Sequence, residues 1–246
     1  MKLLHFLRAL LVVLFAMFLT LLISLVTLFQ TLVLRRDSSS VQGLAAWWAR
    51  SICFVGGVSV SITGTKNLDS GKPYIFAANH QSQFDILTLQ GFLGLDFRWL
   101  AKKELFQVPI WGPAMRRAGY IPIDRTHGRK ALKSLDEAAK KIAAGTSVII
   151  FPEGTRSKDG KLHDFKAGAM VLAIKSGVDI VPVAIKGTYE ILPKGKLLMN
   201  SGNVSIQVGI PIATKNHKSK DRHTLAKILQ EDVAEILDTM TLHAEK

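Results

Sequence analysis

The chain has 246 residues, of which 48% are hydrophobic, and its formal net charge is +13. So many apolar residues exclude a disordered tail protein, and their combination with a strong positive charge is unusual for a freely soluble domain. The length allows one or two domains, and we expect one folded domain with a membrane-binding appendage. The single cysteine, Cys53, excludes an intramolecular disulfide and a multi-cysteine zinc site, and its apolar neighbours predict that it is buried.

The first segment of the chain is an apolar run. Residues 9–34 contain no charged residue over 26 positions, and a bilayer needs about 20 such residues. A cleaved secretory signal is the alternative, because Lys2 and Arg8 precede the run. However, a signal core has roughly 7 to 15 apolar residues and ends at small residues, whereas this run is longer and is followed by Arg35 and Arg36. We therefore expect a retained membrane segment.

A second helix is predicted behind this run. Residues 41–60 carry Trp47 and Trp48 beside Arg50, and tryptophan favours the membrane interface. Cations flank the apolar run on both sides, so charge gives no orientation. Two arrangements stay open: one spanning helix, or a two-helix hairpin that enters and leaves the same leaflet. We expect residues 1–56 to form a membrane-associated helical segment.

Residues 57–246 are expected to form an α/β domain with a mostly parallel central sheet flanked by helices, because short β-rich runs alternate with helical patterns. Strands are predicted at 58–63, 74–78, 97–101, 147–151, 180–185 and 204–208, and helices at 83–93, 131–144, 167–176 and 221–240. This part is basic in its own right, because residues 1–50 hold only five cations and one acid. Anionic lipid or a phosphorylated substrate fits such a surface better than nucleic acid, for which the sequence has no zinc-finger or RNA-binding signature.

Polar residues follow the strand predicted at 74–78, where open α/β folds place their ligands. His80 and Asp85 are five residues apart, so on one continuous helix they would point about 140° apart. They meet only if the chain turns after His80 and Asp85 lies in the first turn of the next helix. In that geometry the carboxylate fixes the imidazole tautomer and leaves the other nitrogen as a general base. Otherwise the two are ordinary surface or capping residues.

A second polar loop follows the strand predicted at 147–151. It contains Glu153, Gly154, Thr155 and Arg156. Glycine permits a turn whose N–H groups face an anion, and the arginine guanidinium is a planar fork suited to phosphate. An ordinary loop between a strand and a helix is the alternative.

Between the two loops, cations are interleaved with aromatic and aliphatic residues. This stretch, at 98–125, either contacts a substrate or lies on anionic lipid. The histidines other than His80 show no pair at metal-ligand spacing on a helix, so no metal site is predicted.

Four blocks occur in an order that resembles the glycerolipid acyltransferase family. They lie at 79–85, 102–125, 151–157 and 181–185. The third block, Phe-Pro-Glu-Gly-Thr-Arg-Ser, is the most specific of them. The chain is most similar to bacterial 1-acyl-sn-glycerol-3-phosphate acyltransferases, and the resemblance covers about residues 57–215.

The resemblance implies roles for individual residues. His80 corresponds to the catalytic base and Asp85 to its orienting partner, and we add Asn79 as a candidate oxyanion donor. The substrate-binding residues are implied to be Glu153, Gly154, Thr155, Arg156, Lys102 and Arg125. The fourth block, at 181–185, is implied to be structural or to line the path of the acyl chain.

The implied reaction transfers a fatty acyl group from acyl-CoA or acyl carrier protein to the free hydroxyl of lysophosphatidic acid, giving phosphatidic acid, without a bound cofactor. The implied partners are lysophosphatidic acid, the acyl donor and membrane phospholipid, and not nucleic acid. The implied location is the bacterial inner membrane, with the domain on its cytoplasmic face. Two alternatives remain: a sister acyltransferase that uses glycerol 3-phosphate or another lysolipid, and a non-catalytic membrane protein that binds anionic lipid.

Overall fold

The structure is a computed structural model that describes residues 2–124 and 129–244. Within these residues, the centre of the molecule is a seven-stranded sheet with the strand order β1-β7-β6-β2-β5-β3-β4. The strands are β1 (Val58–Thr63), β2 (Ile75–Ala78), β3 (Arg98–Lys102), β4 (Ile121–Ile123), β5 (Val148–Ile150), β6 (Ile180–Lys186) and β7 (Gly202–Val208). Neighbouring strands run parallel, except that β6 and β7 are antiparallel. The mostly parallel sheet predicted from the sequence is therefore confirmed.

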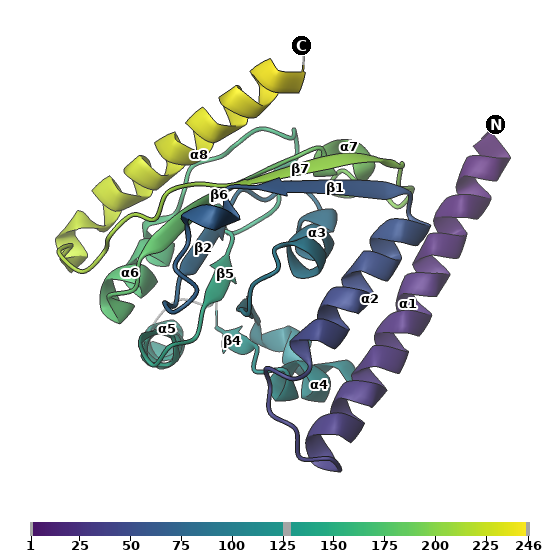
Figure 1. Cartoon of the computed structure of the whole chain (residues 1–246), viewed down its shortest axis with the longest axis horizontal. Helices are drawn as coiled ribbons and strands as arrows, with labels where there is room; N and C mark the ends of the chain where they lie inside the picture. The colour runs from purple at the N-terminus through teal and green to yellow at the C-terminus, as the bar shows by residue number, and fades with distance from the viewer. Residues whose placement is uncertain (1, 125–128, 245–246) are drawn as a thin grey trace.

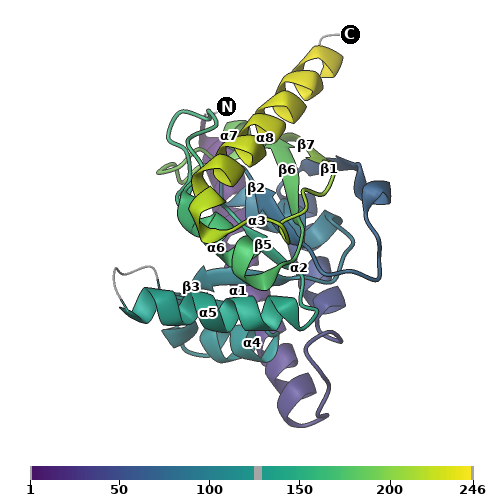
Figure 2. The ribbon, with the colours of Figure 1, turned by 90° about the vertical axis from the view of Figure 1, so that its left-hand side faces the viewer.

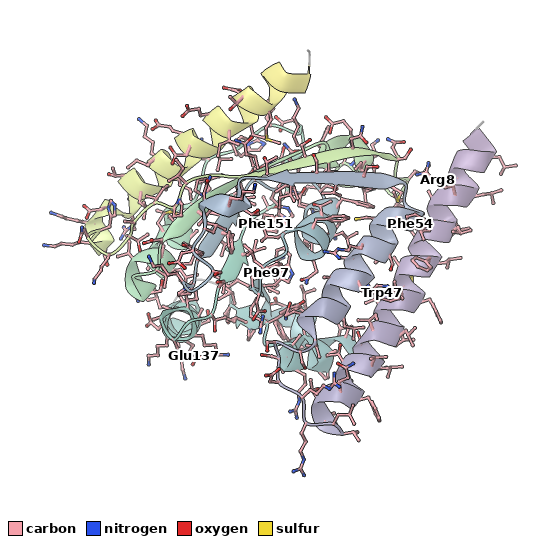
Figure 3. All side chains as sticks on the ribbon, viewed as in Figure 1. Arg8, Trp47, Phe54, Phe97, Glu137 and Phe151 are labelled. Carbon is pink, nitrogen blue, oxygen red and sulfur yellow. The ribbon has the colours of Figure 1, made fainter. Side chains whose placement is uncertain are left out.

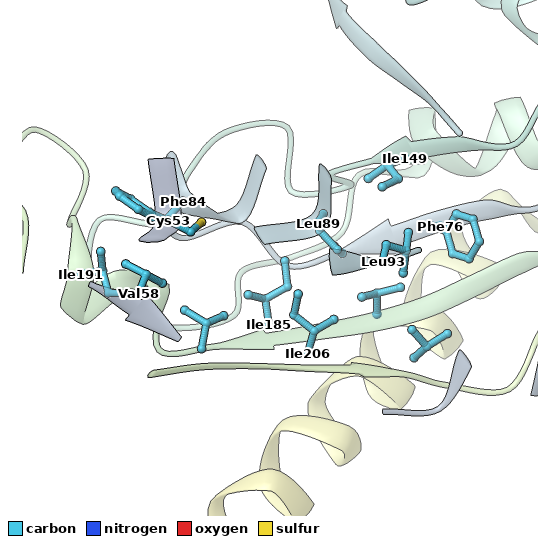
Figure 4. Close-up of a cluster of buried hydrophobic side chains, with 14 of the residues drawn as sticks. Cys53, Val58, Phe76, Phe84, Leu89, Leu93, Ile149, Ile185, Ile191 and Ile206 are labelled. Atoms are coloured by element: carbon cyan, nitrogen blue, oxygen red, sulfur yellow. The ribbon is translucent and has the colours of Figure 1, made fainter. Parts of the chain in front are cut away.

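Helices cover both faces of this sheet (Figures 1 and 2). They are α1 (Lys2–Leu32), α2 (Gln42–Val55), α3 (Phe84–Phe92), α4 (Trp111–Arg117), α5 (Arg129–Ala143), α6 (Ala167–Ser176), α7 (Thr188–Ile191) and α8 (Arg222–Ala244). One core packs α1, α2, α3 and α7 against the sheet, and the other packs α5, α6 and α8 against the opposite face. Figure 4 shows the first core, which includes Cys53 from α2 and Leu89 from α3. Cys53 is fully buried, as predicted.

Each strand and helix predicted for the folded part is present, with boundaries that differ by a few residues. The sequence patterns missed three short elements, β4, α4 and α7, because three to seven residues are too few to show a helical or strand period. Among these, α4 matters for function because it packs against α1 and carries part of the cavity described below.

The first two helices pair as a hairpin (Figure 3). Trp48 Nε1 of α2 donates a hydrogen bond to Thr20 Oγ1 of α1 at 3.0 Å. At the other end of the pair, the Arg8 guanidinium donates to the carbonyl of Gly56 at 2.6 Å. These contacts fasten α1 to the body of the protein and favour a retained segment over a cleaved signal.

The outward face of α1 is apolar and exposed. Residues Phe6–Leu32 have a mean hydropathy of 3.0 over their most apolar window, and only 22% of that window is buried. A core helix of a soluble protein would be mostly buried, whereas this helix exposes side chains such as Met17 (67%) and Phe18 (64%). Since the helix is also long enough to cross a bilayer, the structure supports membrane association through α1.

A close backbone approach at Gly64 gives a stability test of the fold. Gly64 has φ of +85°, and a Cβ added there would lie 1.9 Å from the carbonyl oxygen of Val208, at the end of β7. We expect Gly64→Ala to lower the free energy of unfolding by about 2 kcal/mol or more, because alanine combines a left-handed backbone with a clash. Thermal unfolding of the detergent-solubilised protein measures this change.

The matched control is Gly168→Ala in the first turn of α6, where an added Cβ meets nothing within 4 Å. Alanine is the better helix former, so we expect this control to keep or slightly raise the melting temperature. Equal melting temperatures for the two variants would contradict the packing described for Gly64.

Candidate active site

The turn between β2 and α3 brings His80 and Asp85 together. β2 ends at Ala78 and α3 begins at Phe84, so Asp85 lies in the first helical turn. His80 Nδ1 lies 2.7 Å from Asp85 Oδ2. The two side chains thus meet in the geometry that their spacing required, a turn after the histidine and an aspartate at the start of the helix.

The Asp85 carboxylate is completely buried and satisfied by several donors. Its Oδ2 accepts the backbone N–H groups of Gln81 at 2.7 Å and Ser82 at 2.8 Å, in addition to the imidazole. Its Oδ1 accepts the hydroxyl of Thr188. The carboxylate therefore fixes the shape of the turn as well as the orientation of the His80 ring.

The His80 ring is also held from its face. It stacks on Phe151 with ring centroids 3.8 Å apart and an interplanar angle of 10°. Phe151 in turn packs against Trp99 of β3, and the centroids of these two rings are 5.9 Å apart. Because Nδ1 is engaged by Asp85, Nε2 is the ring nitrogen that is available for proton transfer.

The loop that follows β5 forms hydrogen bonds with the backbone of His80. Glu153 Oε1 accepts the His80 N–H at 2.7 Å, and the His80 carbonyl accepts the N–H of Ser157 at 2.8 Å. Glu153 is only 4% exposed, and this burial raises the pKa of its carboxyl to about 7. The hydrogen bonds that it accepts from the backbone N–H groups of His80 and His163 lower the pKa, but burial has the larger effect. The structure thus places Glu153 against the main chain of His80, outside the residues that line the cavity.

Lysine contacts hold the rest of this loop. Lys194, which follows α7, donates from Nζ to Thr155 Oγ1 at 3.0 Å and to the Arg156 carbonyl at 2.9 Å. Gly154 adopts φ of +75°, and its N–H donates to the carbonyl of Phe151 at 2.9 Å, so the glycine closes a tight turn and its N–H does not face an anion as expected. The sequence analysis missed Lys194, because it lies beyond the four motif blocks in a loop with no pattern of its own.

A cavity of about 490 Å³ opens beside His80. Its polar wall contains His80, Lys102 and Arg156, from the ends of three neighbouring strands. Most of the remaining wall is apolar or aromatic and comes from α1, α2, α3, β3, α4 and the segments that flank α4. This part includes Ile23, Ala45, Trp48, Ile86, Leu100, Leu105, Trp111, Ala114, Met115 and Tyr120. The arrangement places one imidazole and two cations in the wall of a cavity whose lining is otherwise mostly apolar or aromatic.

The remaining predicted site residues have different positions. Arg125 lies outside the described residues. Asn79 uses its side-chain amide to pair with the backbone of β6, donating to the Ile185 carbonyl at 2.8 Å and accepting the Ile185 N–H at 2.7 Å. It is completely buried and does not line the cavity, so the structure does not support our suggestion that it is an oxyanion donor. The block at 181–185 lies in the buried strand β6. This position favours a structural role over a role in lining the path of the acyl chain.

The buried Glu153 carboxyl leads to a prediction about the pH dependence of stability. The pKa is raised from 4.5 to about 7, so the folded state disfavours the charged form. That cost is absent below pH 4.5, grows between pH 4.5 and 7, and is fully present above pH 7. We expect Glu153→Gln, which keeps an oxygen acceptor for His80, to gain stability relative to the parent over this pH window, by at most about 3 kcal/mol.

Thermal unfolding of both proteins between pH 5 and 8 measures this difference. A difference in melting temperature that stays constant across the window would contradict the assignment of a raised pKa to Glu153.

Known proteins resemble this chain in sequence and in fold. A family profile described as Acyltransferase matches residues 59–186, which include β2, β5, β6 and the loops that follow β2 and β5. A chloroplastic 1-acyl-sn-glycerol-3-phosphate acyltransferase of Arabidopsis thaliana is 39% identical over 197 residues, 79% of this chain and 53% of that protein. The alpha form of the enzyme from Ovis aries is 32% identical over 176 residues, 71% of this chain and 61% of that protein.

One solved structure matches nearly the whole chain. The crystal structure of the 1-acyl-sn-glycerophosphate (LPA) acyltransferase from Thermotoga maritima has a TM-score of 0.85 and 29% identity, and the match covers 98% of this chain and 97% of that one. In contrast, the chain spans about half to three fifths of the length of the curated relatives it matches. With the profile covering more than half of its residues, the chain belongs to the acyltransferase family.

Proposed function

We propose that the protein transfers a fatty acyl group from a thioester to the free hydroxyl of 1-acyl-glycerol 3-phosphate, giving phosphatidic acid. The observation that carries this proposal is the cavity in which His80, paired with Asp85, shares a wall with Arg156 and Lys102. The names of the similar proteins support the same acceptor.

The proposed mechanism uses His80 as a general base. Asp85 holds Nδ1, so Nε2 accepts the proton of the lysolipid hydroxyl as its oxygen attacks the thioester carbonyl. The C–S bond then breaks, and the imidazolium returns its proton to the thiolate, which leaves as a free thiol. Asp85 stabilises the transient imidazolium. The thioester is already activated, so the reaction needs no covalent enzyme intermediate.

Arg156 and Lys102 are proposed to bind the phosphate of the acceptor. Both line the cavity with His80, and the guanidinium provides two parallel donors for phosphate oxygens. Fixing the phosphate places the hydroxyl near Nε2, and such positioning is worth several kcal/mol of the activation barrier. Glu153, Gly154 and Thr155 then act through the loop, by holding Arg156 and the backbone of His80.

The apolar wall of the cavity is proposed to receive an acyl chain, and α1 contributes to that wall. The donor is acyl-CoA or acyl carrier protein, and no bound cofactor is required. Because both donors are cytosolic and acidic, we place the basic body on the cytoplasmic face of the bacterial inner membrane. Protease added to intact cells should spare the body and protease added to inverted vesicles should digest it; the opposite pattern would refute this orientation.

The first activity prediction concerns His80→Ala. We expect lysophosphatidate-dependent release of free thiol from acyl-CoA to fall at least about 1000-fold, because the general base is lost. Membrane binding of the variant, measured by flotation with vesicles, should be unchanged, since His80 lines the cavity and is not part of the exposed apolar face of α1. Retention of more than a tenth of the activity would exclude His80 as the base.

The second activity prediction concerns Arg156→Lys. The ammonium keeps the charge but loses the bidentate fork, so we expect the KM for lysophosphatidate to rise about 10-fold or more while the KM for the acyl donor changes little. Arg117→Lys on the exposed end of α4 is the matched control and should leave both constants unchanged. A larger effect on the donor than on the acceptor would assign Arg156 to the donor.

The same assay separates the alternatives. A panel of lysophosphatidate, glycerol 3-phosphate and other lysolipids, each with acyl-CoA and acyl carrier protein donors, identifies a sister acyltransferase by its preferred acceptor. Absence of thiol release with every pair, together with retained vesicle binding, would instead favour a non-catalytic protein that binds anionic lipid.

A further inference from the structure

A loop outside the motif blocks exposes two adjacent leucines. Residues 193–198, between α7 and β7, read Pro-Lys-Gly-Lys-Leu-Leu and are here called the leucine loop. Leu197 is 87% exposed, the highest value among the exposed large apolar side chains of the described residues, and Leu198 is 42% exposed. The next most exposed of these is Phe54, at 84%, in the last turn of α2. Transfer of such exposed apolar side chains from water into lipid is favourable, so they indicate a surface that contacts another molecule or a membrane.

Contacts place the residues that follow this loop at one end of the hairpin. Arg8 of α1 donates a hydrogen bond to Ser201 Oγ at 3.3 Å, and the N–H of Gly202 donates to the carbonyl of Gly57 at 3.2 Å. Figure 3 shows Arg8 and Phe54 at this same corner, near the start of β1. The leucine loop, which ends three residues before Ser201, therefore leads to the end of the hairpin whose helix α1 supports membrane association.

The base of the loop is joined to the candidate active site. Lys194 donates to Thr155 Oγ1 and the Arg156 carbonyl, as described above, and the carbonyl of Leu192 accepts the hydroxyl of Ser82 at 2.8 Å. Beside the leucines, Lys196 is exposed and complements anionic headgroups. A fixed base, an apolar tip and an adjacent cation together fit a loop that contacts a lipid surface.

We propose that the leucine loop is a second membrane contact of this protein. Leu197 and Leu198 enter the bilayer below the headgroups, and Lys196 lies among their phosphates. Through Lys194, this contact sets the Arg156 loop near the height of the headgroups, where the phosphate of a membrane-resident acceptor lies. This last consequence rests on the proposed function, whereas the contact itself does not.

A depth measurement on the full chain tests the contact directly. Leu197→Cys, labelled with a small fluorophore, is bound to phosphatidylcholine and phosphatidylglycerol vesicles whose acyl chains carry spin-label quenchers. The native thiol of Cys53 is fully buried, so the introduced thiol is the accessible one. We expect lipid quenching at position 197 comparable to that of Phe54→Cys. Glu137→Cys, on exposed α5 far from the hairpin in Figure 3, should show none.

Two outcomes would overturn the proposal. One is quenching at position 54 without quenching at position 197. The other is a label at 197 that ignores lipid but responds to added acyl carrier protein, which would make the loop a protein docking site. Neither result needs turnover, so each leaves the proposed acyl transfer standing.

An activity measurement tests the same contact independently. We expect Leu197→Ser combined with Leu198→Ser to raise the KM for long-chain lysophosphatidate in vesicles about 10-fold, because the two leucines that would enter the bilayer are lost from the membrane contact. Activity on a short-chain, water-soluble lysophosphatidate should stay within about twofold. Leu132→Ser, which removes an exposed leucine of α5, is the control and should leave both unchanged. Equal losses on both substrates would refute a membrane role.

Discussion

The buried carboxylate of Asp85 is the interaction on which the site depends. A carboxylate without contact to water must be surrounded by donors, and here the donors are two N–H groups of the preceding turn, the Thr188 hydroxyl and the His80 ring. Each donor comes from a different part of the turn or from α7. The turn therefore has one favourable shape, and the orientation of the imidazole follows from the same hydrogen bonds that stabilise the fold.

A second buried carboxylate, that of Glu153, holds the turn from the opposite side. Its bond to the His80 N–H joins the ends of β2 and β5, which are neighbours in the sheet. Asn79 makes the corresponding link to β6 through two bonds with Ile185. Motif residues that look like substrate ligands in the sequence thus serve in part to tie three parallel strands together at the edge where His80 stands.

The sequence was sufficient to predict the main elements and to state the one arrangement in which His80 and Asp85 could meet. Strands such as β1 and β6 are long enough for their apolar patterns to be distinctive, and a five-residue spacing allows only one way for His80 to meet Asp85. The role of Glu153 could not be predicted, because its partner is a backbone N–H group, which every residue except proline has. Lys194 was missed for a related reason: its contact with the Arg156 loop depends on where a distant loop folds.

The wall of the cavity has a consequence for how the protein is built. Thr20 and Ser24 of α1 and Trp48 of α2 face the same space as His80, and Cys53 belongs to the core beneath the sheet. Removing the first 56 residues would therefore leave the imidazole beside an opened, hydrated cleft and would strip part of the sheet's cover. One face of α1 lines the cavity, and its other face is the exposed apolar surface. A water-soluble form of this protein therefore has to keep the residues of the inner face and replace only those of the outer face with polar residues.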